Sequence, residues 1–297
     1  MAETSKPYTR NGEVLAGTEV PAGIRRIALG LEYNGADFRG FQVQKHDPQT
    51  VQGHLHQALS KVADEPIELV CAGRTDAGVH ATNQVVHFDT LADRPAKAWT
   101  MGVNTKLPDR VAVHWACAMP MEFHARFSAR SRTYRYIIQN TRTRPGIHNG
   151  LVTWDKRTLN LSAMREAAAQ LVGEHDFSSF RAAQCQAKNP VRRIHYLEVI
   201  ELEPYIVIEI SANAFLHHMV RNIVGVLATI ASGEKPLNWV NEVLAAKDRT
   251  QGGITAPAAG LYLVKVEYPA HFNLPNWQPG PSFLRLPLVK SDSNPGS

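Results

Sequence analysis

The sequence predicts an α+β fold with a mainly antiparallel central sheet flanked by helices. Three observations support this class. Apolar residues alternate in strand-like runs along much of the chain, helical stripes interrupt these runs, and the two kinds of element do not alternate strictly as they would around a parallel sheet. The chain has 297 residues, of which 44% are hydrophobic and 20% charged, so it can bury a substantial core.

The first half of the chain begins with a strand, because apolar residues alternate over 27–33 up to an Asn-Gly turn signal. A helix is expected next, since Val51, Leu55 and Leu59 lie on one helical face. The remaining patterns of this half predict strands over 67–71, 84–88, 111–117 and 134–138, and a helix over 96–103.

The second half repeats the mixture. A helix over 161–171 is capped by Asn160 and stopped by Gly173. Further patterns predict strands over 194–201, 205–211 and 261–268, and helices over 214–231 and 237–246. Because 141–151 is rich in Pro, Gly and Arg, the expected domains are an N-terminal extension (1–22), an N-terminal half (23–145), a C-terminal half (146–269) and a Pro-rich tail (270–297).

The two end segments lack periodicity and are expected to be mobile or to cover the fold as extended chain. No apolar run reaches 18 residues, and the N-terminus is polar, so we expect a cytoplasmic protein with no membrane partner. The three cysteines, far apart and odd in number, indicate core residues. No metal is predicted, since His217 and His218 on a helix would point about 100° apart.

Basic residues are concentrated in two stretches, although the net charge of +5 is modest. No acidic residue occurs between Glu122 and Asp155, and a second acid-free stretch covers 177–197. Arginine suits phosphate and aromatic rings suit unstacked bases, so these stretches predict an RNA-facing surface; a solvated strand face is the alternative. The first stretch contains Arg126, Arg130, Arg132, Arg135, Arg142 and Arg144, with Tyr134 and Tyr136 among them.

A glycine-rich segment at 72–81 carries the best candidate for a catalytic group. Gly73 and Gly78 flank Asp76 and allow the chain to bend tightly, while Arg74 would point to the same side in an extended segment. This pattern is compatible with a surface turn that holds a local ion pair. It is also compatible with a carboxylate kept ionised as a nucleophile or general base.

The order of residue types in this segment resembles the motif of pseudouridine synthases, and specifically that of the tRNA pseudouridine synthase A family. The resemblance extends over most of the chain. It includes LEYNGADFRGFQ (31–42), QVVHF (84–88), FHARFSA (123–129), YRYII (134–138), HDFSSF (175–180), NAFLHHMVRNIVG (213–225) and GLYL (260–263).

The resemblance implies a pseudouridine synthase fold, with two similar halves around a basic cleft. It implies an isomerase that converts uridine to pseudouridine at positions 38, 39 and 40 in the anticodon stem-loop of tRNA. The enzyme is expected to act as a homodimer. An isomerisation needs no group donor or redox partner, so no cofactor is expected.

Residue roles follow from the same resemblance. Asp76 matches the catalytic aspartate, which attacks either C6 of the uracil or C1′ of the ribose. Tyr134 matches the tyrosine that stacks on the uracil, and Arg221 matches the basic partner of the aspartate. Arg74 matches a residue that contacts RNA and extrudes the base, and Leu261 one that packs under it.

Physical reasoning agrees with the role of Arg221. It lies in an otherwise apolar helix, where a buried arginine needs a carboxylate partner such as Asp76, unless it reaches solvent from the helix edge. Taking a base out of its stack costs a few kcal/mol, of which stacking on Tyr134 returns roughly 1 to 3 kcal/mol. The further residues expected to contact RNA or line the pocket are Tyr136, Arg126, Arg132 and His217.

Two other functions are weighed against this one. A tRNA-binding or folding protein that has lost catalysis would use the basic stretches equally well, but it gives no reason to keep both Asp76 and Arg221. A metal-dependent phosphodiesterase would need clustered carboxylates or histidines at metal-ligand spacing, and its activity would be lost on adding a chelator.

Overall fold

The computed structural model describes residues 9–10, 13–14, 22–44, 47, 49–185 and 187–284. The chain forms two compact units, residues 1–130 with 265–278 (unit 1) and residues 131–264 with 279–297 (unit 2). The division therefore falls after residue 130 and not after 145. The physical reason is strand β7 (Ser131–Asn140), which pairs along its length with a strand of the second unit.

Unit 1 contains most of the elements predicted for the first half. Its helical elements are α1 (Val51–Ala63), a 3-10 turn (Gly35–Asp37) and a π-helical turn (Ala98–Gly102) inside the predicted helix over 96–103. Its strands are β1 (Thr9–Arg10), β2 (Glu13–Val14), β3 (Arg25–Tyr33), β4 (Leu69–Cys71), β5 (His80–Thr90) and β6 (Val111–Met119).

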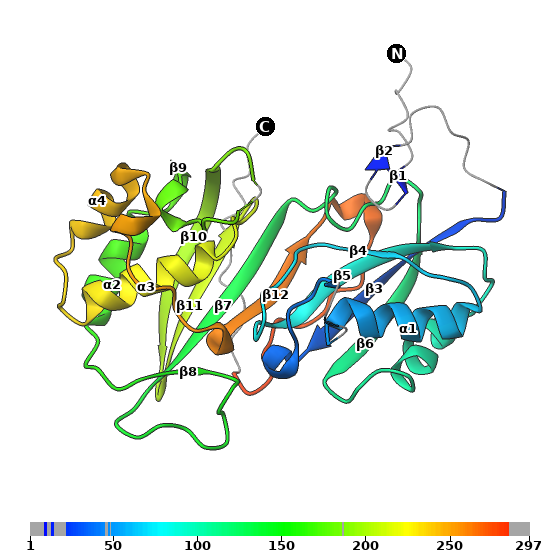
Figure 1. Cartoon of the computed structure of the whole chain (residues 1–297), viewed down its shortest axis with the longest axis horizontal. Helices are drawn as coiled ribbons and strands as arrows, with labels where there is room; N and C mark the ends of the chain where they lie inside the picture. Colours follow the sequence, from blue (N-terminus) through cyan, green and yellow to red (C-terminus); the bar gives the residue numbers. More distant parts are fainter. Residues whose placement is uncertain are drawn as a thin grey trace, which may run out of the picture. The chain divides into compact units, whose positions relative to one another are not determined.

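The sheet of unit 1 is antiparallel, with β3 between β6 and β5, and with β4 on the other side of β5. Helix α1 lies across one face of this sheet (Figure 1). Thr50 caps the helix through the amide of Gly53, and Leu55 and Leu59 are fully buried. A second hydrophobic core contains Phe123 and Phe272 together with residues of β3, β5 and β6. The central strand β3 is therefore buried on both faces.

The described residues of unit 2 form four more strands, three helices and three 3-10 turns. Its strands besides β7 are β8 (Thr153–Asp155), β9 (Gly173–Asp176), β10 (Val191–Leu202) and β11 (Tyr205–Ala212). Its helical elements are α2 (Leu161–Ala169), α3 (Met219–Ala231), α4 (Trp239–Ala246) and the 3-10 turns Ser178–Phe180, Arg249–Gln251 and Ala258–Gly260.

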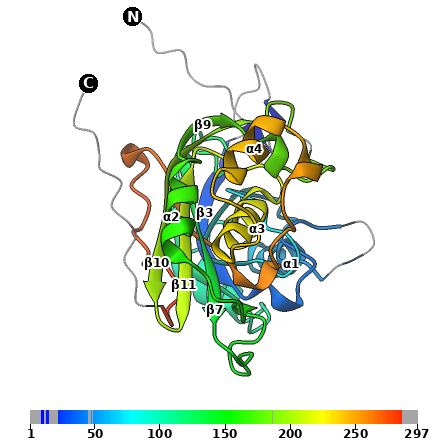
Figure 2. The ribbon, with the colours of Figure 1, turned by 90° about the vertical axis from the view of Figure 1, so that its left-hand side faces the viewer.

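The sheet of unit 2 runs in the order β7, β11, β10, β9 with antiparallel pairing, and β8 adds to β7 in parallel. Helix α2 packs against β10 and α3 (Figure 2). Asn160 accepts a hydrogen bond from the amide of Ala163, which confirms the predicted cap of α2. The buried face of α3 includes Ile223 and Leu227. The mixed helices and antiparallel strands confirm the predicted α+β class.

The chain after α4 returns through β12 (Leu261–Glu267), whose first four residues belong to unit 2 and whose last three belong to unit 1. A 3-10 turn (Ala270–Phe272) follows. The described part of the predicted tail covers the fold, since Phe272 lies in the core of unit 1 and Leu284 in the core of unit 2. Residues 285–297 and most of the predicted 1–22 extension lie outside the described residues.

One predicted helix is shorter than expected. The apolar stripe suggested a start at Ala214, but α3 begins at Met219, because His218 has a φ of 62°, in the left-handed region, where an α-helix cannot continue. No helix among the described residues has the length and apolar character needed to cross a membrane.

Candidate active site

The loop that carries Asp76 connects β4 and β5 in unit 1. It runs over residues 72–79, and the side chain of Asp76 is half-buried while Arg74 is exposed. The amide of Ala72 donates to the carbonyl of Val85 at 2.8 Å, and the amide of Val79 donates to the carbonyl of Asp76 itself at 3.1 Å. The loop is thus closed at its base and bent tightly at its tip.

Two buried polar side chains support this loop from the sheet below. The side-chain amide of Gln84 on β5 donates to the carbonyl of Gly73 at 2.6 Å and to the hydroxyl of Tyr33 at 3.4 Å. The hydroxyl of Tyr33 on β3 lies 2.8 Å from that of Thr75. Because Gln84 and Tyr33 are both buried, these bonds fix the residues just before Asp76 in a water-poor setting.

The segment 35–41 holds the loop from its other side. The amide of Phe41 donates to the carbonyl of Thr75 at 3.0 Å, and the amide of Gly78 donates to the carbonyl of Phe38 at 3.3 Å. Gly40 has a φ of +98°, and a Cβ atom there would lie 2.9 Å from the carbonyl oxygen of Thr75. Glycine is required at this position on both counts.

Sequence reasoning therefore found the catalytic candidate but missed its supports, Tyr33, Gly40 and Gln84. All three stand in segments that carried the family resemblance, so a signal was present. A glutamine inside an apolar strand was the clearest sign, because a buried amide must have hydrogen-bond partners.

Arg221 lies in the first turn of α3 in unit 2, where it is half-buried. Its Nε donates to the carbonyl of Ala256 at 2.7 Å, and its own carbonyl accepts from the amide of Ala256 at 3.1 Å. The side chain is therefore held by Ala256 and does not simply extend into solvent. Its pairing with Asp76, which belongs to unit 1, stays a prediction.

A buried polar network beside Arg221 was not foreseen. Asn222 donates to the carbonyl of Phe180 at 2.8 Å and accepts from the hydroxyl of Thr255 at 2.6 Å and from Arg249 at 3.1 Å. Thr255 precedes Ala256, the residue that holds Arg221. The network thus ties α3 to the segment that orients the candidate catalytic arginine.

Tyr134 and Leu261 are both buried in unit 2. Tyr134 lies on β7 opposite Ile210, and its ring meets that of Phe215 edge-to-face at 5.0 Å. Leu261 begins β12, directly after a 3-10 turn. The contact of both residues with a uracil stays a prediction.

The expected contact between Tyr136 and RNA is not supported. Tyr136 is fully buried in unit 2, and its hydroxyl bonds to the hydroxyl of Thr153 at 2.6 Å and to the carbonyl of Pro257 at 2.8 Å. Burial raises the pKa of this phenol well above its usual value, and the nearby Arg221 opposes that shift only in part. The alternation of β7 places Tyr136 in the core, so it has a structural role next to Arg221.

The other predicted contact residues are accessible. Arg126 is exposed in unit 1, and in unit 2 His217 is exposed while Arg132 is half-buried and donates to the carbonyl of Asn213 at 3.2 Å. His217 and His218 precede α3, and their ring centroids lie 4.0 Å apart. The expectation that a helix would separate these two rings is therefore wrong.

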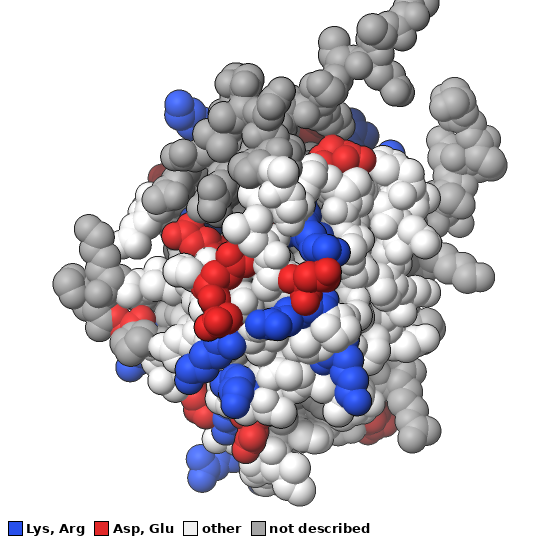
Figure 3. Space-filling model, turned by 90° about the vertical axis from the view of Figure 1, so that its right-hand side faces the viewer, with Lys and Arg blue, Asp and Glu red and all other residues white. Residues whose placement is uncertain are grey.

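Basic groups do not dominate every surface. Unit 1 carries exposed ion pairs such as Arg25–Asp93 and Arg110–Asp37, and Figure 3 shows a face on which basic and acidic side chains lie side by side. Such a face is a poor match to a polyanion. The acid-free stretch between Glu122 and Asp155 therefore remains the better place to look for RNA contacts.

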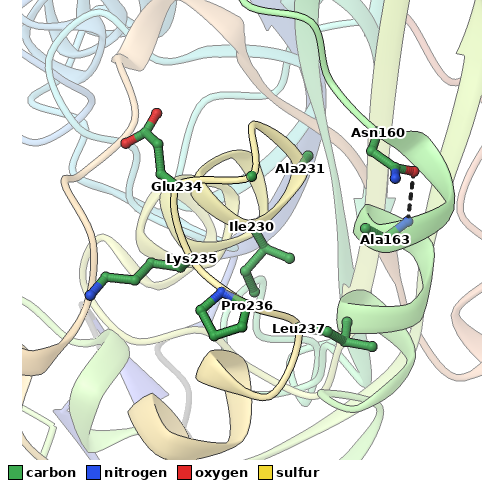
Figure 4. Close-up of a pocket in the computed structure, with 9 residues that line it drawn as sticks. Asn160, Ala163, Ile230, Ala231, Glu234, Lys235, Pro236 and Leu237 are labelled. Carbon is green, nitrogen blue, oxygen red and sulfur yellow. Dashed lines mark hydrogen bonds between the residues drawn. The ribbon is translucent and has the colours of Figure 1, made fainter.

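A depression of about 500 Å³ in unit 2 lies between the start of α2 and the end of α3. Asn160, Ile230 and Leu237 are among the residues that line it, and Figure 4 shows that the Glu234 and Lys235 side chains extend away from Ile230 and Leu237. None of the candidate catalytic residues lines it. This depression is thus separate from the candidate site.

Comparison with known proteins supports a single family. A family model described as tRNA pseudouridine synthase matches residues 32–128 and 167–269. The chain is 56% identical to tRNA pseudouridine synthase A of Pseudomonas aeruginosa, over 91% of this chain and 94% of that protein. It is 59% identical to tRNA pseudouridine synthase A of Nitrosococcus oceani, over 84% and 96% of the two chains.

Among solved structures, a Cbf5–Nop10–Gar1 complex matches with a TM-score of 0.34 and 11% identity, over 80% of this chain and 48% of that one. That likeness is too weak to indicate a shared function. The family match covers both units and includes the Asp76 loop, Arg221 and Leu261. The chain therefore belongs to the tRNA pseudouridine synthase family.

Proposed function

We propose that this protein isomerises uridine to pseudouridine in tRNA, at positions 38, 39 and 40 of the anticodon stem-loop, with Asp76 as the nucleophile. The observation that carries the proposal is the loop of Asp76. The loop is held by Gln84, Tyr33 and Phe41 on two sides, while the Asp76 side chain is left half-buried. A nucleophile needs this combination of fixed position and access.

The reaction is balanced without any external group. The bond between N1 of the uracil and C1′ of the ribose breaks, and a bond between C5 and C1′ forms after the base has rotated. The hydrogen on C5 leaves as a proton, and N1 gains one. Asp76 must be ionised to attack, and Arg221, oriented by Ala256, is the proposed cation that keeps it so.

The same proposal assigns the surrounding residues. Tyr134 stacks on the extruded uracil and assists removal of the C5 proton, and Leu261 packs under the base. Arg74, exposed beside Asp76, contacts the RNA and displaces the base. Arg126, Arg132 and His217 make further contacts to the anticodon arm.

We place the reaction in a homodimer, as the family resemblance implies, and in the cytoplasm, as the polar N-terminus and the lack of a long apolar run in the sequence suggest. In this arrangement, one tRNA contacts both subunits. Crosslinking at increasing protein concentration, with and without tRNA, tests the dimer. A monomer at all concentrations would remove this part of the proposal.

The function is tested with purified protein and unmodified anticodon stem-loops that carry one uridine, tritiated at C5, at position 38, 39 or 40. Because the C5 hydrogen is lost, isomerisation releases tritium into water. We expect release from all three stem-loops and none from a stem-loop whose only uridine lies outside positions 38, 39 and 40. Mass spectrometry after base-specific labelling identifies the product.

Two outcomes separate the alternatives. Tight binding without tritium release would indicate an RNA-binding protein that has lost catalysis. Loss of activity on adding a chelator, with cleaved RNA as the product, would indicate a metal-dependent phosphodiesterase.

A further inference from the structure

Phe127 presents its ring to solvent in unit 1, in the loop that follows β6. Its exposed fraction is 62%, which is high for a phenylalanine. Single exposed apolar residues are common on protein surfaces, so exposure alone indicates nothing. What distinguishes Phe127 is that its ring is held in one orientation, parallel to the ring of His124 at 4.3 Å and 25°.

The backbone around Phe127 is fixed by the same histidine. Nδ1 of His124 accepts hydrogen bonds from the amides of Arg126, at 3.2 Å, and Phe127, at 3.1 Å. The amide of His124 donates to the hydroxyl of Ser128, and the amide of Ser128 donates to the carbonyl of His124. Residues 124–128 thus form a closed turn with the histidine ring inside and the phenyl ring outside.

This turn stands on a rigid base. Arg26, whose side chain is fully buried on β3, donates to the carbonyls of Met121 and Phe123 at 2.6 and 2.7 Å. Its guanidinium also makes two bonds of 2.8 Å to Asp89 on β5. An arginine that is paired with a carboxylate and bonded to two carbonyls leaves the loop little freedom.

The charges near the ring favour one class of partner. The Arg126 guanidinium lies 5.5 Å from the Phe127 ring centroid, and Arg130 is exposed three residues further on. No acidic residue follows Glu122 until Asp155. A protein partner would require a wider apolar patch, whereas one flat ring beside arginines suits a strand with phosphates and unstacked bases.

We propose that Phe127 is a stacking platform for an unpaired base of the RNA substrate, with Arg126 contacting an adjacent phosphate. This inference rests on the proposed function, since it takes RNA as the substrate. It assigns Phe127 to substrate binding and leaves the chemical step to Asp76. The platform holds the RNA strand at a point of unit 1 other than the Asp76 loop.

The test measures the affinity and the turnover of four proteins with an anticodon stem-loop that carries a tritiated uridine at position 39. The proteins are the wild type, Phe127→Ala, Phe127→Leu and Phe127→Trp. Leucine keeps an apolar side chain but has no ring, and tryptophan keeps the ring. Loss of one stacked base predicts about a 10-fold increase in Kd and KM for the alanine and leucine variants. The tryptophan variant should bind as tightly as the wild type.

Two readouts separate stacking from a structural role. The variants should keep the wild-type kcat at saturating RNA and the wild-type Tm, because the ring is exposed. The affinity difference should disappear with a fully paired RNA duplex, which offers no unstacked base. In addition, tryptophan fluorescence of Phe127→Trp, after subtraction of the wild-type signal, should be quenched on adding the stem-loop.

A wild-type Kd for either the leucine or the alanine variant would overturn the proposal that Phe127 stacks on a base. If the alanine variant fails to fold, the leucine and tryptophan variants still decide the question. Failure of the proposed function would give a different result. The wild-type protein would then release no tritium, although substitution of Phe127 would still change its Kd for the stem-loop.

Discussion

The hydroxyl groups of Tyr33 and Thr75 lie 2.8 Å apart, and Thr75 directly precedes Asp76 in the chain. Tyr33 belongs to the central strand of unit 1, and Thr75 belongs to the loop that carries the proposed nucleophile. The bond therefore connects the most rigid part of this unit to the residue that must be held still. It makes the position of Asp76 depend on a side chain far from it in sequence.

Removing the Tyr33 hydroxyl should slow the reaction with little effect on folding. Tyr33→Phe loses bonds to Thr75 and Gln84, each with a net contribution of about 1 kcal/mol. We expect kcat to fall several-fold while Tm changes by a few degrees at most. The control is Tyr205→Phe in unit 2, which loses a bond of 2.7 Å to His148. Equal kcat values for the two variants would contradict the role given to Tyr33.

Gly40 is expected to tolerate no side chain. Gly40→Ala would strain the backbone by about 1–2 kcal/mol and place its Cβ against the carbonyl of Thr75. Tritium release should drop at least 10-fold. Gly233→Ala is a matched control, since Gly233 also has a positive φ but has no atom within 4 Å of the added Cβ. The control should lose some stability and no activity. An active Gly40→Ala enzyme would show that the loop is not held as described.

Asn222 should matter for both stability and catalysis. Asn222→Ala leaves the carbonyl of Phe180 without this donor and removes the acceptor shared by Thr255 and Arg249, which keep their mutual bond of 2.9 Å, at a cost of about 1–3 kcal/mol. Because Ala256 then loses its fixed position, the kcat of the folded fraction should also fall. Asn241→Ala, an exposed change on α4, is the control for both measurements. A variant with lowered Tm and wild-type kcat would limit Asn222 to a structural role.

The protein should become less stable in mild acid because of His124. Burial, together with the nearby cations Arg26 and Arg126, lowers the pKa of His124 from 6.5 to about 4. Burial also lowers the pKa of His87, whose ring lies 4.7 Å from that of His124. The unfolded chain therefore takes up protons that the folded one does not, so this stability is complete above pH 6.5 and is lost progressively toward pH 4.

This pH dependence is measured by urea unfolding at pH 7.5 and at pH 5. His124→Asn keeps an acceptor near Nδ1 but removes the titration, so its loss of stability between the two pH values should be smaller than that of the wild type. If the two proteins lose the same amount, His124 is not a source of the acid sensitivity.

Periodicity predicted most of the strands and α1 because a buried face repeats at a fixed interval, but it missed the short strands β1, β2, β8 and β9. It failed at α3, where Phe215 and Leu216 extend the apolar stripe although the chain turns at His218. The buried ion pair of Arg26 with Asp89 joins residues 63 apart, and no local pattern announces such a partner. The composition of this stretch also suggested that Tyr136 contacts RNA. A count of arginines and tyrosines does not say which face of a strand is buried, so it could not show that Tyr136 lies in the core.

For the site, the resemblance supplied the candidate catalytic residues, and the structure showed the groups that support the Asp76 loop and Arg221. Gln84 and Gly40 act through hydrogen bonds and close approach of the backbone, which depend on the fold and not on spacing in the sequence. The convergence of Tyr134 and Arg221 on Asp76, at the base of a basic cleft, stays a prediction.

The central claim is that Asp76 is the nucleophile, and single-turnover tritium release by Asp76→Asn tests it most directly. Asp64→Asn, an exposed change at the end of α1, serves as the control. We predict no release and no pseudouridine from Asp76→Asn at enzyme excess, with stem-loop affinity close to that of the wild type. Pseudouridine formation by Asp76→Asn at the wild-type rate would contradict the claim.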